Sequence, residues 1–371
     1  MQEIAVIGSG LNGLAVAFGL AEKGSHVTIF EEKTFGGNFK QDFRTSFFSH
    51  NTIAFFEKFR KEIEENSGMI EYIYSYKTEE KPIVELAGSN LGYVVDNFFI
   101  KELLVNFLRN HKNVVIHENT QVETISDWQD TIKINSQKFK IAVCASGANS
   151  SIHKKLGLEQ KLLPYNQVAL VFDIKHQNDH QNIAIEAFDE SCIAALLPKK
   201  NKNTSSVILS LKNRYAEKLQ DDRLLEFLHA KTHRARHIGE ILEIPSKICR
   251  YPLAMKYMNQ QLHGNMIFIG DSFHAVHPVL GQGFNMSLKD IQKLCNHLAE
   301  MQSLGVSLNQ NLQSLPLKNF ANHLKIGSAT HIFGGAFISK NPVLKLLTSA
   351  SISVGASIST RLKTKVLEKL L

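Results

Sequence analysis

Apolar runs that alternate with glycine-bearing turns predict the first elements of the chain. Residues 4–7 form a short apolar run that indicates a buried strand, and residues 14–23 predict a helix that ends at Gly24. A second apolar run at residues 27–30 predicts another strand, and a helix is expected around residues 52–65. A strand, a helix and a strand in this order predict a βαβ unit of an α/β fold.

Further along, the pattern predicts that separate segments of the chain complete the first sheet and that a second sheet is inserted between these segments. Residues 83–95 alternate loosely and indicate a strand, and residues 98–110 indicate a helix. Short strands that return to the first sheet are expected at residues 114–117, 122–125, 132–134 and 141–145. Residues 165–211 predict several strands of a second sheet, residues 221–241 predict a helix, and the chain re-enters the first domain near residue 255.

The loop after the first strand has the spacing of a dinucleotide-binding turn. It comprises Gly8, Ser9, Gly10, Leu11, Asn12 and Gly13. We expect Gly8 to allow the tight turn, Gly10 to let the backbone approach a pyrophosphate, and Gly13 to let the helix pack on the strand. Glu31 ends the next strand, where an acid accepts from ribose hydroxyls, and the adjacent Glu32 is the alternative. This loop alone does not separate NAD from FAD, and an ordinary glycine turn is the competing interpretation.

A second loop, far along the chain, complements the first. The apolar run at residues 266–269 ends at Gly270 and Asp271, whose carboxylate is placed to accept from ribitol or ribose hydroxyls. A helix that runs to about residue 300 is expected to follow, and its amides would face the flavin pyrimidine. The segment that opens this helix contains Pro278, Gly281, Gln282, Gly283, Phe284 and Asn285. Together the two loops predict FAD bound in an extended form.

These motifs resemble those of the flavin-dependent aromatic hydroxylases, and within them the ubiquinone-biosynthesis branch. The resemblance covers most of the chain and is carried by both loops and by the segments at residues 91–97, 165–169, 184–188 and 195–198. It implies an α/β fold with a Rossmann-like FAD-binding domain, an inserted β-sheet substrate domain of the para-hydroxybenzoate hydroxylase type, and a C-terminal helical segment. It also implies that Arg44 contacts FAD and that Lys101 and Val122 lie at the cofactor.

Domain boundaries follow from this resemblance and from the order of the predicted elements. The FAD-binding domain is expected to be discontinuous, over residues 1–80, 96–158 and 255–315. Residues 81–95 and 159–254 are assigned to the substrate-binding sheet, and residues 316–371 to the C-terminal helical region.

Some residues depart from the family pattern. Ser146 stands where the family has an acid, His153 stands near a family arginine, and Lys101 replaces an expected glutamine or arginine. The region at residues 320–325 lacks paired arginines. The resemblance places the first two positions near the FAD diphosphate and the nicotinamide donor, so donor binding is expected to differ.

The resemblance implies an FAD-dependent monooxygenase that hydroxylates a polyprenylated phenol in ubiquinone biosynthesis. NAD(P)H and O2 would be consumed through a flavin hydroperoxide. Two alternatives stay open: a hydroxylase of a soluble aromatic substrate, and a catalytically weak FAD-binding subunit of a biosynthetic complex. No catalytic residue is assigned, because Tyr165, Glu186 and His277 are each explained as well by a structural role. His274 and His277 do not predict a metal site, since no further ligand completes a set.

Composition limits the setting and the partners. A chain of 371 residues with 43% hydrophobic residues can bury the core of two interleaved domains. The net charge of +7 allows an anionic partner, but no motif predicts binding of nucleic acid. The four scattered cysteines and the lack of a signal-peptide pattern indicate a cytoplasmic setting.

The end of the chain offers two interpretations. Residues 362–370 place a leucine- and valine-rich stripe beside basic residues, which predicts peripheral contact with the inner face of a membrane. Packing of this stripe on the chain's own domain, or on a partner in a homo-oligomer or biosynthetic complex, is the alternative.

Overall fold

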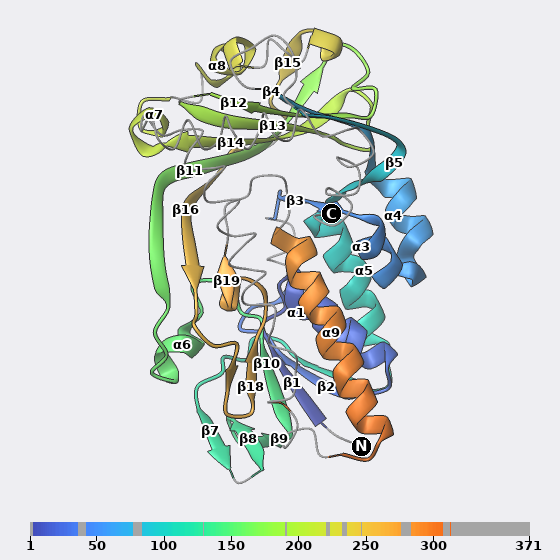
Figure 1. Cartoon of the computed structure of the whole chain (residues 1–371), viewed down its shortest axis with the longest axis vertical. Helices are drawn as coiled ribbons and strands as arrows, with labels where there is room; N and C mark the ends of the chain where they lie inside the picture. Colours follow the sequence, from blue (N-terminus) through green and yellow to red (C-terminus); the bar gives the residue numbers. More distant parts are fainter. Residues whose placement is uncertain are drawn as a thin grey trace.

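The computed structural model describes residues 3–35, 42–76, 84–128, 130–189, 191–219, 223–231, 236–245, 247–275, 283–306 and residue 312. Two regions lie one above the other along the longest axis (Figure 1). The lower region is layered and holds the N terminus, and the upper region is built on a large sheet. The long strands β11 (Lys161–His176) and β16 (Cys249–Tyr257) run from the large sheet toward the lower region and connect the two.

The lower region is built on a six-stranded sheet with the order β17-β18-β10-β1-β2-β6. Strands from β18 to β6 are parallel to their neighbours, and β17 pairs antiparallel with β18. The strands are β1 (Glu3–Ile7), β2 (His26–Phe30), β6 (Val114–His117), β10 (Ile141–Cys144), β17 (Leu262–His263) and β18 (Met266–Phe268). The predicted βαβ start is confirmed.

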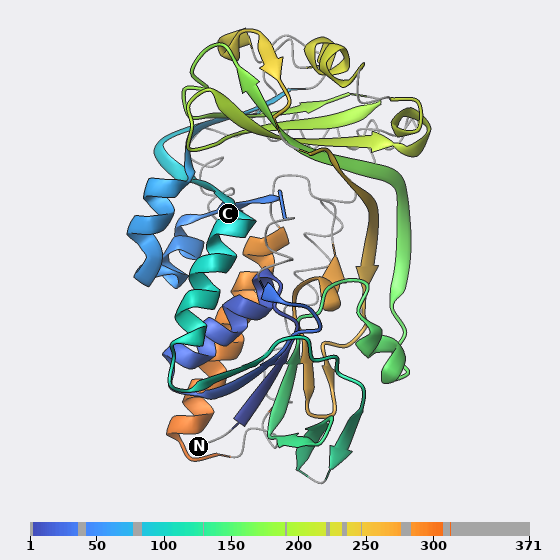
Figure 2. The same ribbon diagram turned by 180° about the vertical axis from the view of Figure 1, so that it is seen from behind.

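Both faces of this sheet are covered, which explains why its central strands are apolar throughout. Three helices pack around the core on one face: α1 (Leu11–Glu22), α5 (Asn97–Arg109) and α9 (Gly283–Ser303). They lie together on one side of the molecule in both views (Figures 1 and 2). A separate apolar cluster, which includes Phe139 and Phe268, covers the other face. The helix predicted to follow the second loop is therefore present as α9.

Three short strands form a separate antiparallel sheet: β7 (Ile125–Trp128), β8 (Thr131–Ile134) and β9 (Gln137–Phe139). The prediction that residues 122–125 and 132–134 return to the first sheet is wrong. In β8 only alternate residues are buried, which is typical of an antiparallel strand with one covered face. Asn135, with a φ of 51°, turns the chain back between β8 and β9.

The upper region is built on a ten-stranded sheet whose main path is β19-β16-β11-β14-β13-β12-β4-β5-β3, with β15 beside β11. Besides β11 and β16 it contains β3 (Thr45–Phe48), β4 (Gly68–Tyr76), β5 (Val84–Asp96), β12 (Ile183–Phe188), β13 (Cys192–Pro198), β14 (Thr204–Lys212), β15 (Ile241–Glu243) and β19 (His274–Ala275). All pairs are antiparallel except β4 with β12. The predicted domain boundaries place residues 68–76 in the FAD-binding part, whereas β4 pairs within this sheet.

Alternation along β14 distinguishes the two faces of the large sheet. Leu209 and Leu211 pack into a core with α7 (Asn213–Ala216) and α8 (Leu224–Lys231), and they define the outer face. Ile208, which alternates with them, lies on the opposite face and lines the cavity. We call this the inner face, and it looks toward the lower region.

Two predicted helices differ from the structure. Among the described residues of the predicted helix at 221–241, residues 224–231 form α8 and residues 236–238 form a 3-10 turn, and Gly239, whose φ of 70° helices do not use, ends the helical structure before residue 241. The helix predicted over residues 52–65 is divided at Phe56, whose ψ of 32° breaks the helical path. Its pieces are α3 (His50–Phe55), η1 (Glu57–Phe59) and α4 (Arg60–Asn66).

Candidate cofactor and substrate site

The glycine loop between β1 and α1 has the geometry that its spacing predicts. Gly8 adopts a φ of 96°, and a Cβ there would lie 2.7 Å from the Cα of Ser146. A Cβ on Gly13 would lie 1.9 Å from the carbonyl oxygen of Gly8. A Cβ on Gly10 would meet no protein atom within 4 Å. Two glycines are thus required by packing, whereas the third leaves open space in front of the loop.

The start of α1 is available to an anionic ligand. Gly10 is its N-cap residue and provides no capping side chain. Among the described residues, the Oδ1 atom of Asn12 is buried without a hydrogen-bond partner. Free helix-terminal amides attract phosphate groups, and an orphaned buried acceptor marks a place for a missing donor. These features fit a dinucleotide.

Glu31 lies at the end of β2, facing the same loop. Its Oε2 atom accepts hydrogen bonds from the backbone amide of Ser9 at 2.8 Å and from the Ser9 hydroxyl at 2.6 Å. Ser9 therefore orients the carboxylate. It lies inside the glycine motif but was not among the predicted site residues. Both Glu31 and its predicted alternative Glu32 border the open space.

One cavity of about 610 Å3 extends from this loop to the inner face of the large sheet. Its wall includes the predicted residues Gly8, Gly10, Leu11, Asn12, Glu31, Arg44, Val122, Asp271, Gly283 and Phe284. Polar residues that were not among the predicted site residues also line it: Thr45, Ser46, Asn97, Thr120, Gln121 and Ser151. They come from four separate parts of the chain and share no local motif, so only the fold brings them together.

The remaining predicted site residues lie elsewhere. Gly13 packs behind the loop, as described above. Asn285 is buried and holds the start of α9 against β3, because it accepts from Thr52 Oγ1 at 2.6 Å and donates to the Phe47 carbonyl at 2.9 Å. Pro278, Gly281, Gln282 and the candidate base His277 lie outside the described residues.

Lys101 does not line the cavity but belongs to an ion cluster behind its wall. Arg44 donates to Asp42 from Nε at 2.7 Å and from Nη2 at 3.0 Å, and Lys101 Nζ donates to the same carboxylate. Burial opposes ionisation of Asp42, but the hydrogen bonds and charges of both cations outweigh it and lower its pKa to about 2. Burial lowers the pKa of Lys101, against the attraction of Asp42. Asp42 thus fixes Arg44 at the cavity.

Asp271 follows β18, which is two strands from β1 in the sheet, and it lines the cavity together with the glycine loop. The surrounding protein shields this carboxyl from water and thereby raises its pKa, while the positive charge of Arg44 acts in the opposite direction. A carboxylate with few protein donors of its own is suited to accept hydrogen bonds from ligand hydroxyls.

Ser146, one of the residues that depart from the family pattern, belongs to a turn rich in hydroxyl groups. Ser146 donates to Ser150 at 2.6 Å, and both line the cavity. Lys256 Nζ donates to the Ala148 carbonyl at 3.1 Å and reinforces the turn. His153 is buried behind it, with Nε2 2.7 Å from the Ser272 carbonyl. His153 therefore serves as a structural residue and does not replace an arginine at the cavity.

The candidate bases do not converge on one point. Tyr165 borders a second, open hollow with Lys212 and Arg214, whereas Glu186 is buried on the inner face, opposite Ala195 of β13. Among the described residues, no three histidines, cysteines or carboxylates are grouped so as to hold a metal ion. Within the same residues, no helix is long and apolar enough to cross a bilayer.

Comparison with known proteins identifies the family. Residues 1–305 match the family model described as "FAD binding domain". The chain belongs to this FAD-binding family. It is 23% identical over 376 residues to the 3-demethoxyubiquinol 3-hydroxylase of Escherichia coli (strain K12), covering 94% of this chain and 93% of that protein. It is 24% identical over 385 residues to the ubiquinone hydroxylase UbiM of Neisseria meningitidis, covering 95% and 81%.

A solved structure shows the same fold. The p-nitrophenol 4-monooxygenase PnpA from Pseudomonas putida DLL-E4 superposes with a TM-score of 0.78, at 17% identity, over 100% of this chain and 99% of that chain. The predicted family, the α/β fold with an inserted sheet, the FAD cofactor and the FAD-dependent monooxygenase class are therefore confirmed. The part played by each individual residue at the cofactor remains a proposal.

Proposed function

We propose that this FAD-binding protein hydroxylates a phenolic precursor of ubiquinone. The observation that carries the proposal is the extent of the cavity, which begins at Gly8 and Glu31 and continues past Arg44 to Ile208 on the inner face of the large sheet. One space thus adjoins a dinucleotide turn and a second sheet. Such an arrangement lets a substrate ring lie beside a cofactor at the ~3–3.5 Å separation that reaction requires.

At the cofactor end, the glycine loop and α1 are the proposed diphosphate site. The amides of Leu11 and Asn12 would donate to the phosphates, and Glu31 would accept from ribose hydroxyls. Asp271 would accept from the ribitol chain, with Arg44 close enough to balance its charge. When bound, FAD supplies electron transfer and the activation of oxygen.

At the sheet end, the proposed substrate is a polyprenylated phenol. The similarity to a 3-demethoxyubiquinol 3-hydroxylase and to a ubiquinone hydroxylase supports this substrate class. NAD(P)H is the proposed electron donor. Ser146 and Ser150 offer it neutral hydroxyls, so we expect the charge of the donor to be met chiefly by Lys256 at the edge of the turn.

The proposal is tested by loading the protein with FAD and measuring oxidation of NADH and NADPH in air, with and without a short-chain polyprenylphenol. We expect the phenol to accelerate donor oxidation and to yield a product that is one oxygen atom heavier. Product mass distinguishes hydroxylation from donor oxidation that merely produces peroxide.

Other outcomes identify the alternatives. Donor oxidation that is stimulated only by soluble phenols without a tail would indicate a hydroxylase of soluble aromatics. Bound FAD that neither donor reduces would indicate an accessory FAD-binding subunit. Failure to retain FAD after refolding or reconstitution would overturn all of these functions.

A further inference from the structure

A chain of polar side chains leads from the cavity wall to a buried carboxylate on the inner face of the large sheet. Thr45, the first residue of β3, lines the cavity. Its Oγ1 donates to the hydroxyl of Ser206 on β14 at 3.5 Å. Ser206 is fully buried and is the direct cross-strand partner of Asp173 on β11, so the two side chains are neighbours on the inner face. The Thr45 hydroxyl therefore donates away from the cavity, toward the strand pair that holds Asp173.

The carboxylate at the end of this chain is held by charges from two further elements. Lys199, which follows β13, contacts Asp173 at 2.8 Å and Asp96 of β5 at 2.9 Å. The charges of both Lys199 and Asp96 act on Asp173. Burial raises the pKa of Asp173, and repulsion from Asp96 adds to it, against the attraction of Lys199. Because one cation faces two carboxylates, a proton on one carboxylate would balance the remaining negative charge.

On the basis of the function proposed above, we propose that Asp173 receives the proton of the substrate's phenolic hydroxyl through Thr45 and Ser206. The phenol donates to Thr45 Oγ1, Thr45 donates to Ser206, and Ser206 donates to Asp173. When each proton moves one position, the phenol becomes a phenolate and Asp173 becomes a neutral carboxylic acid, so charge and protons balance. A phenolate ring is richer in electrons and reacts faster with an electrophilic oxygen.

The network has a competing explanation as a purely structural tie. In the strand order, β5 and β3 lie at the far end of the sheet from β11, so the contact between Asp96 and Lys199 joins segments that the hydrogen-bonded path keeps apart. A tie of this kind would affect stability at every pH to a similar extent. Proton transfer instead predicts an effect that depends on whether the phenol is already ionised.

The test uses 4-nitrophenol, whose ionised form absorbs visible light, and protein loaded with FAD. At about pH 6 the neutral form of a phenol prevails in water, since an ordinary phenolic hydroxyl ionises near pH 10 and the nitro group only lowers this partly. We expect the bound probe to show the phenolate band in a difference spectrum. Asp173→Asn and Thr45→Val should both lose the band, and Asp173→Glu should restore part of it.

The control is Ser210→Ala, which removes a buried hydroxyl from the same face of the same strand, two pairs further along β14. It should keep the phenolate band, whereas Ser206→Ala should lose it. Thr45→Val leaves the ion pairs of Lys199 with Asp173 and Asp96 in place, so it remains informative even if Asp173→Asn fails to fold. Absence of the band in the wild-type protein at saturating probe, or its persistence in both Asp173→Asn and Thr45→Val, would overturn the proposal.

A kinetic measurement separates this proposal from the proposed function. With a short-chain polyprenylphenol, Asp173→Asn should reduce kcat/KM about 100-fold at about pH 6, and the deficit should narrow as pH rises toward the pKa of the free phenol. A deficit that is equal at all pH values would indicate the structural tie. A wild-type protein that forms the phenolate of the probe but yields no hydroxylated product would contradict the function while leaving the proton path intact.

Discussion

The two ends of the cavity owe their geometry to different parts of the chain, backbone at one end and side chains at the other. At the cofactor end, backbone and glycine determine the geometry, and residues from Gly8 to Gly13 supply it within a single turn. At the sheet end, side chains of Thr45, Ser206 and Asp173 come from three strands that are far apart in the sequence. The first end depends on close packing and the second on charge and hydrogen bonding, so they should respond to different substitutions.

The largest effect is expected from a single methyl group in the glycine loop. Gly13→Ala would place its Cβ 1.9 Å from the Gly8 carbonyl oxygen, so β1 and α1 must separate. We expect a loss of about 3 kcal/mol in the free energy of unfolding, together with loss of FAD. Urea denaturation and the flavin content of the purified protein measure the two effects.

Gly10→Ala is the matched control for this substitution. Its Cβ would meet no protein atom within 4 Å, and its backbone, with a φ of −61°, accepts alanine without strain. The apoprotein should keep its stability, while FAD should bind more weakly because the methyl group enters the cavity. Equal destabilisation by both substitutions would contradict the distinction between a packing glycine and a glycine that leaves space for the ligand.

A smaller effect is expected at Asp42, which pairs with Lys101 and holds Arg44 at the cavity. Its pKa of about 2 lies below the ordinary value of 3.8, so its ionised form contributes stability at pH values above about 4. This contribution, about 2 kcal/mol, should disappear as pH falls from about 4 through about 2. Asp42→Asn should remove it at neutral pH and flatten the acid limb of a stability–pH curve.

Glu57→Gln provides the comparison, because it removes an exposed carboxylate that pairs with Arg60 at 2.5 Å. Exposed ion pairs contribute little, so this variant should resemble the wild-type protein throughout the titration. If Asp42→Asn and Glu57→Gln had the same small effect, the ion cluster behind the cavity would not stabilise the fold as its burial implies.

The same contrast explains what could be predicted from the sequence. Glycine spacing and an acid at a strand end are local signals, and they led to Gly8, Gly10 and Glu31 because a βαβ unit places them in one way only. Val122 and Arg44 came from the family resemblance, and both line the cavity. No local signal marks Asp173 or Ser206, since each strand contains several polar residues and no motif singles out one of them.

The misplaced elements have a related physical cause. Residues 132–134 have the same alternating composition whether they join the first sheet or a small separate one, and the turn at Asn135 decides between the two. The end of the helix predicted over residues 221–241 depends on Gly239. A helical periodicity tolerates a glycine at this position, but its φ of 70° is incompatible with a helix. Lys101 was expected at the cofactor, yet its partner Asp42 could be recognised only from the fold.

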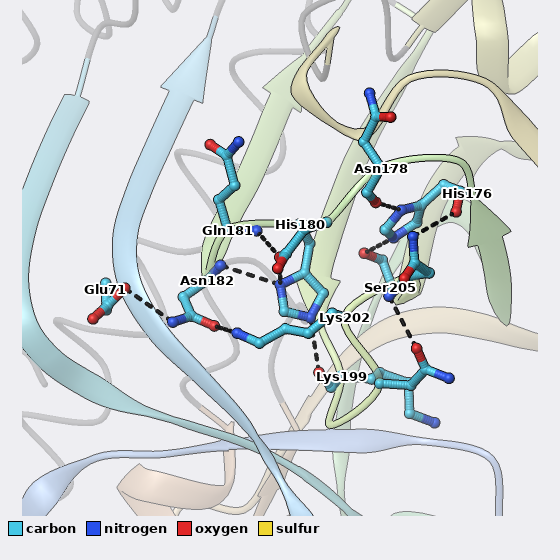
Figure 3. Close-up of polar contacts among 12 residues, drawn as sticks. Glu71, His176, Asn178, His180, Gln181, Asn182, Lys199, Lys202 and Ser205 are labelled. Atoms are coloured by element: carbon cyan, nitrogen blue, oxygen red, sulfur yellow. Dashed lines mark hydrogen bonds and ion pairs between the residues drawn. The ribbon is translucent and has the colours of Figure 1, made fainter.

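The smallest effect is expected at the outer end of the large sheet, where titratable groups are kept neutral. His180 is buried, its Nδ1 accepts from the Asn182 amide at 3.1 Å, and its Nε2 donates to the Lys199 carbonyl at 2.9 Å (Figure 3). His176 lies beside it, with Nε2 3.0 Å from the Ser205 hydroxyl. A proton added to Nδ1 of His180 would face the Asn182 N–H, so the ring fits this site only when it is neutral.

Burial lowers the pKa values of both histidines, outweighing their hydrogen bonds to carbonyl groups and the charge of Asp179. A lowered pKa in the folded state means that stability is complete above the unfolded-state value of about 6.5 and is lost as pH falls below it. We expect a loss of about 1 kcal/mol between about pH 7 and about pH 5. His180→Gln, which cannot be protonated, should show a shallower dependence in urea denaturation, whereas His263→Gln on exposed β17 should follow the wild-type curve. Parallel curves for wild type and His180→Gln would show that the buried histidine does not control the acid sensitivity of this part of the sheet. The acid sensitivity of the protein would then have to come from the ion cluster of Asp42, Arg44 and Lys101.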